Sequence, residues 1–192
     1  AAPGAGAGAA AAAAVPERLP LRVAAIQANV SLADKWDDAK LDSTTIPYDR
    51  LSRQAAAAGA ELAVWAETAV PNYLIFEEEL LSWVRHLALE TKLFLFVGYP
   101  HARLMPGAQE PLRFNGAGLF GPDGRLHDFY AKAHLLPFGE RMPFQALMPF
   151  LGKVDVGQAE WSEGAPPAPI IVATAHGEYR FAPLICFESI FP

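Results

Sequence analysis

Short apolar runs alternate with longer amphipathic segments along the first half of the chain. Residues 21–29, 61–66 and 93–98 are mostly apolar and end at polar residues, as buried strands do. Between them, residues 47–58 and 76–90 place apolar side chains at helical spacing. A strand, helix, strand alternation of this kind predicts an α/β fold.

The second half of the chain shows a different pattern, with short strands and one long irregular segment. A Gly-Pro-Asp-Gly turn separates residues 114–120 from 125–130, which predicts a β-hairpin. Residues 135–169 are rich in proline and glycine and lack periodicity, so they predict a long structured loop. A last apolar run, residues 179–185, predicts a final strand that carries Cys186 at its carboxyl end. Open α/β sheets bind their ligands at such ends.

The domain organisation follows from where these patterns begin and stop. Residues 1–20 are dominated by alanine, glycine and proline, which predicts a low-complexity linker. Residues 21–192 then form one domain, which is long enough for a substantial core. The sequence ends shortly after the final predicted strand, where an α/β sheet would normally continue. We therefore expect this domain to be incomplete at its C-terminus.

Composition and charge exclude several classes of partner. The chain has 15 lysine and arginine residues and 21 aspartate and glutamate residues, which gives a net charge of −6. It contains no run of basic residues that could bind along the phosphate backbone of a nucleic acid. We therefore expect no nucleic-acid partner. No apolar stretch approaches the roughly 18 to 20 residues that span a bilayer. The sequence also predicts neither a metal nor a cofactor.

The single cysteine is the first candidate for chemistry. Cys186 cannot form an internal disulfide, and its position alone favours a small core residue over a nucleophile. A thiol attacks only as a thiolate, which requires a base or a cation nearby. Glu67 directly follows the run 61–66 and would reach the same sheet edge as Cys186, where it could serve as that base. The alternative for Glu67 is a helix cap or a solvated acid.

Two further side chains follow the predicted hairpin. The ammonium group of Lys132 could stabilise a thiolate and the oxyanion of a tetrahedral intermediate, although most lysines are surface residues. His134 offers an alternative base, and beside the apolar Leu135 it is more often a structural side chain. The residues alone leave both alternatives open.

Together these motifs resemble the nitrilase, or carbon–nitrogen hydrolase, superfamily and, within it, the apolipoprotein N-acyltransferases. The resemblance covers most of residues 21–192, and His134 to Glu140 followed by Pro143 carries the likeness to the acyltransferase branch. The matching segments are Val23 to Asn29, Lys35-Trp36, Val64 to Pro71, Phe114-Asn115, Lys132 to Glu140 and Ile185 to Pro192.

The resemblance implies a fold and a catalytic triad. The fold is an α-β-β-α sandwich, here truncated at its C-terminus. Glu67 is then the general base, Lys132 stabilises the thiolate and the oxyanion, and Cys186 is the nucleophile that becomes acylated.

The resemblance also assigns supporting positions. Glu140 and Glu188 would orient the triad, and Trp36 would contact the acyl chain or another part of the substrate. This chain departs from the family pattern at Ala66, where proline is common, and at Phe187, where tyrosine is common.

The implied reaction is N-acylation of apolipoproteins. A phospholipid donates its acyl chain through a cysteine thioester to the amine of a diacylglyceryl-cysteine at the apolipoprotein N-terminus. Such an enzyme lies in the bacterial inner membrane with its catalytic domain in the periplasm, and its membrane helices would precede this chain. Four loop residues could form an apolar lid or simply pack within the loop: Leu147, Met148, Phe150 and Leu151.

Two other functions remain as alternatives. A soluble amidase or nitrilase could use the same Glu–Lys–Cys triad on a small amide or nitrile, with water as the acceptor. A catalytically silent binding module could also keep the fold.

Overall fold

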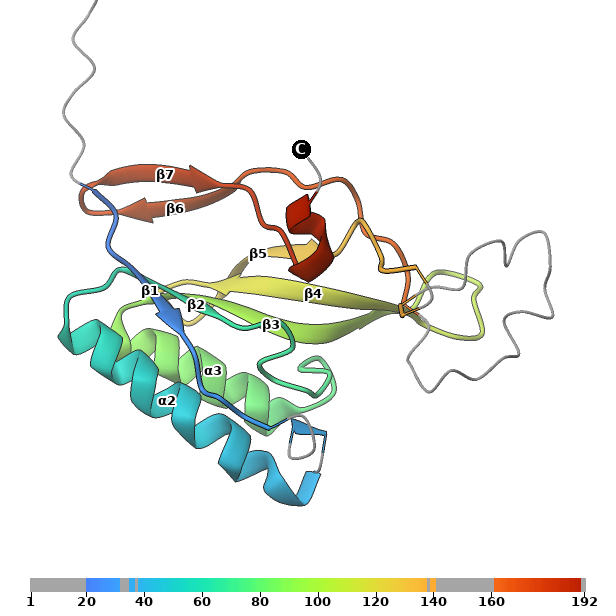
Figure 1. Ribbon diagram of the computed structural model, residues 1–192, viewed down its shortest axis with the longest axis horizontal. Coiled ribbons are helices and arrows are strands. Elements are labelled where there is room, and N and C mark those ends of the chain that lie inside the picture. Colours follow the sequence, from blue (N-terminus) through green and yellow to red (C-terminus); the bar gives the residue numbers. More distant parts are fainter. Residues whose placement is uncertain (1–19, 32–34, 37, 138, 141–160, 191–192) are drawn as a thin grey trace, which may run out of the picture.

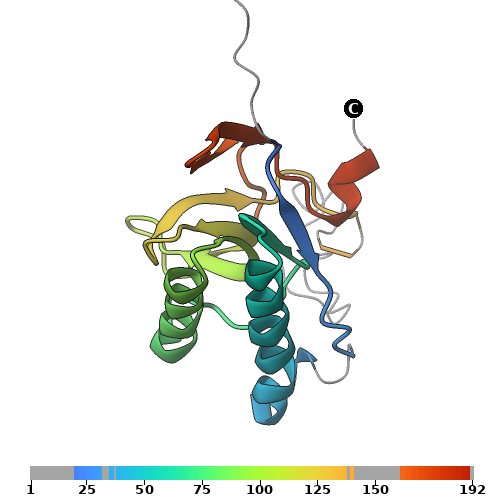
Figure 2. The same ribbon diagram turned by 90° about the vertical axis from the view of Figure 1, so that its left-hand side faces the viewer.

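The structure is a computed structural model that describes residues 20–31, 35–36, 38–137, 139–140 and 161–190. These residues form three layers, in which two helices cover one face of a five-stranded sheet and a two-stranded sheet covers the other (Figures 1 and 2). The architecture is the mixed α/β class that the sequence predicts. Almost all of the predicted linker, the four predicted lid residues and Pro143 lie outside the described residues.

The larger sheet combines parallel and antiparallel pairing. The first three strands are parallel, and the last two turn back as antiparallel neighbours, including the predicted hairpin. Within the described residues its strands, in spatial order, are β1 (Val23–Ile26), β2 (Leu62–Trp65), β3 (Phe94–Arg103), β4 (Leu112–Phe120) and β5 (Leu126–Ala131). The third strand extends beyond the predicted 93–98 because β4 pairs with it as far as Arg103.

Two α-helices pack against this sheet. The helix α3 (Glu78–Thr91) agrees with the predicted segment, whereas α2 (Leu41–Ala57) begins six residues before the predicted start at Pro47. Pro47 lies inside α2 and has no N–H to donate to the carbonyl of Ser43. Ser43 is exposed, so water can hydrate that carbonyl and the helix continues through the proline. No helix in the described residues has both the length and the apolar character needed to cross a membrane.

The smaller sheet corrects one prediction. Its strands are β6 (Ile170–Thr174) and β7 (Gly177–Phe181), and they pair only with each other in the described residues. The predicted final strand 179–185 was wrong in its end and in its sheet, because β7 stops at Phe181. Pro183 follows two residues later and lacks the N–H that a further ladder would need.

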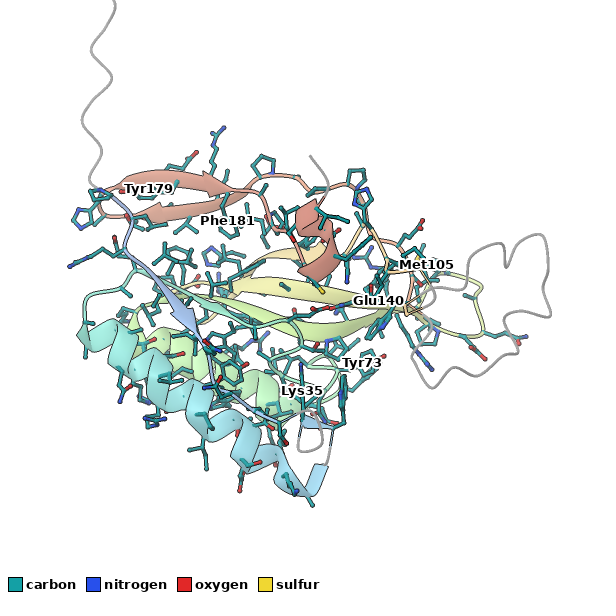
Figure 3. All side chains as sticks on the ribbon, viewed as in Figure 1. Lys35, Tyr73, Met105, Glu140, Tyr179 and Phe181 are labelled. Carbon is teal, nitrogen blue, oxygen red and sulfur yellow. The ribbon has the colours of Figure 1, made fainter. Side chains whose placement is uncertain are left out.

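Alternating side chains join the smaller sheet to the larger one. Ile170 and Val172 are buried while Ile171 between them is exposed, so one face of β6 lies against the neighbouring layer. Phe181 of β7, labelled in Figure 3, contacts Phe96 of β3 edge to face. Their ring centroids are 5.3 Å apart. The region between the sheets is therefore an apolar core in its own right.

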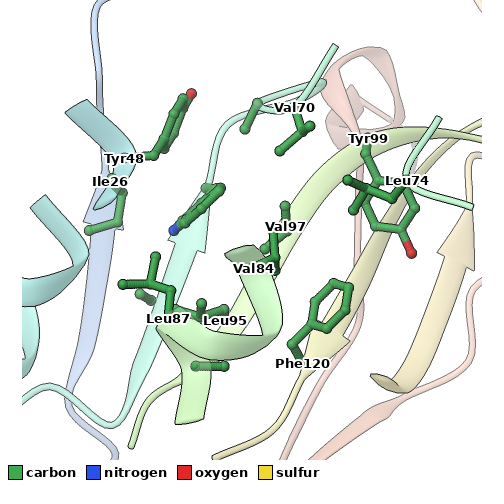
Figure 4. Close-up of a cluster of buried hydrophobic side chains, with 14 of the residues drawn as sticks. Ile26, Tyr48, Val70, Leu74, Val84, Leu87, Leu95, Val97, Tyr99 and Phe120 are labelled. Atoms are coloured by element: carbon green, nitrogen blue, oxygen red, sulfur yellow. The ribbon is translucent and has the colours of Figure 1, made fainter. Parts of the chain in front are cut away.

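The main core lies between the larger sheet and the helices (Figure 4). Leu95, Val97 and Tyr99 of β3 all point to this side, because alternate residues of a strand share a face. Trp65 stacks on Tyr48 of α2 with ring centroids 4.7 Å apart. This contact anchors the carboxyl end of β2, where Trp65 lies, to α2.

Candidate active site

Glu67 lies in a tight turn directly after β2. Thr68, the next residue, has a positive φ of 49°, which is strained for a β-branched side chain. The turn rests on Gly98 of β3, where an added Cβ would lie 2.4 Å from the Ala66 carbonyl oxygen and 2.8 Å from the Thr68 nitrogen. Only glycine lets the two backbones approach so closely.

Asn115 lies in β4, beside Lys132, which directly follows β5. The Asn115 carbonyl accepts a hydrogen bond from the Lys132 backbone N–H at 2.8 Å. Asn115 shares the strand face of Ala117, and Lys132 follows Tyr130 by two residues. Ala117 and Tyr130 both belong to the core that faces the smaller sheet. The side chains of Asn115 and Lys132 are therefore directed between the layers.

A hydrogen-bond network joins these groups to two carboxylates. The amide Nδ2 of Asn115 donates to the Oε1 of Glu67 at 2.6 Å and to the Oε1 of Glu140 at 3.0 Å. The Lys132 Nζ lies 2.9 Å from Oε1 and 2.8 Å from Oε2 of Glu140, and 3.7 Å from Oε1 of Glu67. The Lys132 side chain is only 1% exposed. Because a buried ammonium is costly without counter-charge, these two carboxylates account for its position.

Glu140 is itself held by a local turn. Its Oε2 accepts a hydrogen bond from the Leu136 N–H at 2.8 Å, and its own N–H donates to the Leu136 carbonyl at 2.9 Å. Figure 3 shows Glu140 toward the end of the sheet where the chain passes from β3 to β4. The structure thus brings together three of the five predicted catalytic and supporting residues: Glu67, Lys132 and Glu140.

Glu188, the second predicted supporting carboxylate, lies in a separate buried site. Its Oε1 accepts hydrogen bonds from the Tyr130 hydroxyl at 2.6 Å and from the backbone N–H groups of Ala133 and His134 at 2.8 and 2.9 Å. Its Oε2 accepts one from the Ile185 N–H at 2.8 Å. Glu188 therefore joins the turn that contains the cysteine to the segment that directly follows Lys132.

These contacts change how the pair Glu188 and Tyr130 titrates. Burial acts to raise the pKa of the Glu188 carboxyl, but the hydrogen bonds from Tyr130 and from three backbone N–H groups outweigh it and lower the pKa. Burial, together with the hydrogen bond to Glu188, raises the pKa of the Tyr130 hydroxyl. Glu188 is therefore ionised at neutral pH, and Tyr130 is the donor between them.

Replacing Glu188 by glutamine is expected to lower the free energy of unfolding by about 2–4 kcal/mol, because an amide cannot accept all four hydrogen bonds. The folded-state pKa of Glu188 lies below its ordinary value of 4.5, so its stabilisation is complete above that pH and is lost as the pH falls through the folded value. In thermal unfolding of the whole protein, the difference in stability between the parent and E188Q should shrink below about pH 4. A difference independent of pH would contradict this role for the carboxylate.

Cys186 begins the 3₁₀ helix η3 (Cys186–Ile190) and is exposed. Its φ of 51° is positive, which is uncommon for a residue with a side chain, and such strain is often found at functional sites. The Ser189 hydroxyl donates to its carbonyl at 2.9 Å. Among the described residues no hydrogen bond joins the Cys186 sulfur to Glu67 or Lys132, and Glu188 connects the turn that contains Cys186 to the segment that follows Lys132.

The remaining predicted residues lie around this network. Trp36 is 54% exposed, and its ring centroid lies 5.9 Å from the Lys35 ammonium. His134 is half exposed, and its Nδ1 lies 3.7 Å from the Oε1 of Glu188. Neither position tests a contact with substrate.

Sequence reasoning gave no role to two residues that contact Glu67 directly, Asn115 and Lys35. Asn115 carries a detectable signal, because it is a polar residue of low strand propensity within a predicted strand. Lys35 carries a signal only through the family-matching pair Lys35-Trp36, since a lysine outside the predicted helices and strands is ordinarily solvated.

Comparison with known proteins places these residues in a family context. The model of the carbon–nitrogen hydrolase family matches residues 22–192. An apolipoprotein N-acyltransferase from Geobacter metallireducens is 40% identical over 175 residues, which are 90% of this chain and 32% of that protein. Another from Azotobacter vinelandii is 34% identical over 179 residues, 92% of this chain and 33% of that protein. The chain thus spans about a third of the length of these curated relatives.

Solved structures support the same fold. A variant of the amidase from Nesterenkonia sp. AN1, with acrylamide added to its active-site cysteine, has a TM-score of 0.57 and 17% identity, covering 88% of this chain and 58% of that one. A second variant, with the acetamide moiety of fluoroacetamide on that cysteine, has a TM-score of 0.58 and 18% identity, covering 89% and 57%. These structures confirm the nitrilase-like fold class, and the family model and the two curated relatives confirm the resemblance that the sequence motifs predict.

Proposed function

This chain belongs to the carbon–nitrogen hydrolase family, and we propose that it supplies the acyl-transfer site of an apolipoprotein N-acyltransferase. Glu67, Lys132 and Cys186 are the proposed catalytic residues. The observation that carries the proposal is the buried Lys132 ammonium, held by Glu140 and 3.7 Å from Glu67. A lysine in this position supplies a fixed positive charge where an oxyanion can form.

The first half of the reaction acylates the cysteine. Glu67 takes the thiol proton as the Cys186 sulfur attacks the ester carbonyl of a phospholipid, and a C–S bond forms. Lys132 stabilises the negative oxygen of the tetrahedral intermediate. The intermediate then breaks the C–O bond, and Glu67 returns its proton to the leaving alkoxide. The products are a thioester on Cys186 and a lysophospholipid.

The second half transfers the acyl chain to nitrogen. The α-amine of the diacylglyceryl-cysteine at an apolipoprotein N-terminus attacks the thioester carbonyl. Glu67 takes a proton from the amine, the C–S bond breaks, and Glu67 passes that proton to the leaving Cys186 sulfur. An N-acylated lipoprotein results, and the free cysteine is regenerated.

Other residues support this reaction without taking part in bond changes. Glu140 and Asn115 fix Lys132 and Glu67 relative to each other, as the hydrogen bonds among them indicate. Glu188 fixes the turn that presents Cys186. Trp36, exposed beside Lys35, is the proposed contact for the acyl chain or another part of the lipid.

Both proposed substrates are lipids, so the proposed setting is a membrane. We assign the catalytic domain to the periplasmic side of the bacterial inner membrane, carried by membrane helices that precede this chain in the whole protein. The phospholipid donor and the diacylglyceryl apolipoprotein acceptor would reach the site from the bilayer.

A second candidate is an amidase that hydrolyses a small amide with the same triad and water. The similar fold of the Nesterenkonia amidase favours keeping it as a candidate. The identities of 34–40% to proteins named apolipoprotein N-acyltransferase favour the acyltransferase.

Mass spectrometry after incubation with phospholipid separates these functions. The whole protein is expected to gain a long-chain acyl mass on the peptide that contains Cys186, and C186A is expected to gain none. A protein that forms no such adduct but hydrolyses short amides would overturn the acyltransferase in favour of the amidase. A protein that does neither would be the silent binding module.

His134 provides a specific check on the assignment of the base. H134A is expected to keep a detectable acyl adduct, because His134 contacts the Glu188 site and Glu67 carries the proposed proton transfer. If H134A were as inactive as C186A in the same experiment, the base would have been assigned to the wrong residue.

A further inference from the structure

We propose that Lys35 is a positioning residue that holds the Glu67 turn in its working geometry. The inference rests on the proposed function, in which Glu67 is the general base. The Lys35 Nζ donates a hydrogen bond of 3.0 Å to the backbone carbonyl of Glu67, from a segment 32 residues earlier in the sequence. Lys35 therefore contacts the base through its backbone and leaves the carboxylate to Asn115 and Lys132.

The Glu67 turn is a segment that requires such a contact. Its strained residue, Thr68 with φ of 49°, would relax if the surrounding structure did not hold it. Gly98 supports the turn from the strand below, and the Val70 N–H donates to the Gly98 carbonyl at 3.1 Å. Lys35 supplies a further contact, at the carbonyl of Glu67 itself. The base is thus held at its backbone as well as at its side chain.

The balance of charge around the site is a second argument for this role of Lys35. Glu67 and Glu140 bring two negative charges, while Lys132 brings one positive charge. Lys35 is the second ammonium beside Glu67, and with it the four groups balance. Burial lowers the pKa of Lys35, and attraction to Glu67 acts in the opposite direction.

The pocket beside Lys35 has room for the larger side chain of arginine, so a conservative substitution can test the role of the positive charge. Lys35 lines a pocket of about 420 Å³ that also touches Ala66 and Ala69 on either side of the base. A guanidinium group can enter this pocket and still donate to the Glu67 carbonyl. Arginine should therefore replace lysine here with little loss, whereas methionine keeps only the apolar stem.

The experiment compares K35M, K35R and the distant control K92M in the whole protein. The readout is the rate of acyl thioester formation on Cys186 in phospholipid vesicles. K35M is expected to lower kcat about 10- to 100-fold with little change in KM, since a displaced base loses alignment with the thiol rather than affinity for lipid. K35R should recover most of that loss, and K92M should match the parent.

Rescue by arginine and the split between kcat and KM separate positioning from a purely structural role. Among the described residues, the hydrogen-bond and charge partners of Glu67 are Lys35, Lys132 and Asn115, with Glu140 bound to the latter two. K35R keeps a donor for the Glu67 carbonyl, so it should recover most of the parent kcat, whereas K35M should lose kcat without a lower Tm. Parent-like rates in K35M would overturn the proposal. A loss that K35R does not rescue, accompanied by a lower Tm, would overturn it as well.

A substrate-independent readout keeps this inference distinct from the acyltransferase proposal. If the parent forms no thioester with phospholipid, the proposed function fails. Alkylation of Cys186 by iodoacetamide then still reports whether Glu67 is aligned with the thiol. K35M should slow that alkylation at least fivefold relative to the parent and to K92M, and equal rates would overturn the positioning role.

Discussion

Replacing Glu67 by glutamine should slow acyl thioester formation on Cys186 by about 10²- to 10⁴-fold, the range typical of losing a general base. Glutamine keeps an Oε1 that can accept from Asn115 Nδ2, which donates to Glu67 at 2.6 Å. The geometry should therefore survive while the capacity to take a proton is lost. Single-turnover acylation followed by mass spectrometry of the Cys186 peptide measures the effect.

The matched control for this substitution is E61Q. Glu61 stands just before the other end of β2, where its carboxylate accepts from the Arg22 N–H at 3.3 Å, far along the strand from the site. It should change the acylation rate less than twofold. If E67Q acylated Cys186 within threefold of the parent, Glu67 would not be the base, whatever the control did.

Replacing Gly98 by alanine should act on stability and activity together. The added Cβ would meet backbone atoms of the Glu67 turn at 2.4 and 2.8 Å, and backbone cannot rotate away as a side chain can. We expect a loss of about 2–3 kcal/mol in the free energy of unfolding, typical of severe overpacking. Because the displaced turn carries Glu67, the proposed base, acylation should also fall at least 100-fold at temperatures where the variant is fully folded.

V97A separates the two parts of that effect. Val97 is the neighbouring residue in β3, fully buried on the helix side, away from the Glu67 turn. Losing two buried methyl groups should cost about 2 kcal/mol of stability. Thermal unfolding should therefore place V97A near G98A, while its acylation rate at low temperature stays near the parent. Equal activity in the two variants would contradict the claim that Gly98 supports the base.

Much of the fold was predictable because apolar runs of strand length are a local signal. The three parallel strands, the hairpin and the helix α3 follow from such runs. The start of α2 was not, because Pro47 usually marks a first turn and here lies within the helix. The separate sheet of β6 and β7 was not predictable either, since strand pairing depends on contacts far apart in the sequence.

The site shows the same division between local and distant signals. Glu67 and Lys132 follow apolar strands, so their meeting at the sheet was predictable from position and family resemblance. Asn115 and Lys35 act through hydrogen bonds to residues 48 and 32 positions away, and no local pattern reports such partners. Glu188 was predicted as a supporting carboxylate, but its contact with the segment after Lys132 appears only in three dimensions.

One measurement tests most directly whether a single acid–base site activates the cysteine. Iodoacetamide alkylates Cys186 without any lipid substrate, so the rate reports only the surroundings of the sulfur. Mass spectrometry of the Cys186 peptide over time should show alkylation at neutral pH at least tenfold slower in E67Q and in K132M than in the parent. Equal rates in the parent and both variants would mean that Cys186 lies outside the reach of Glu67 and Lys132, and the proposed triad would be wrong.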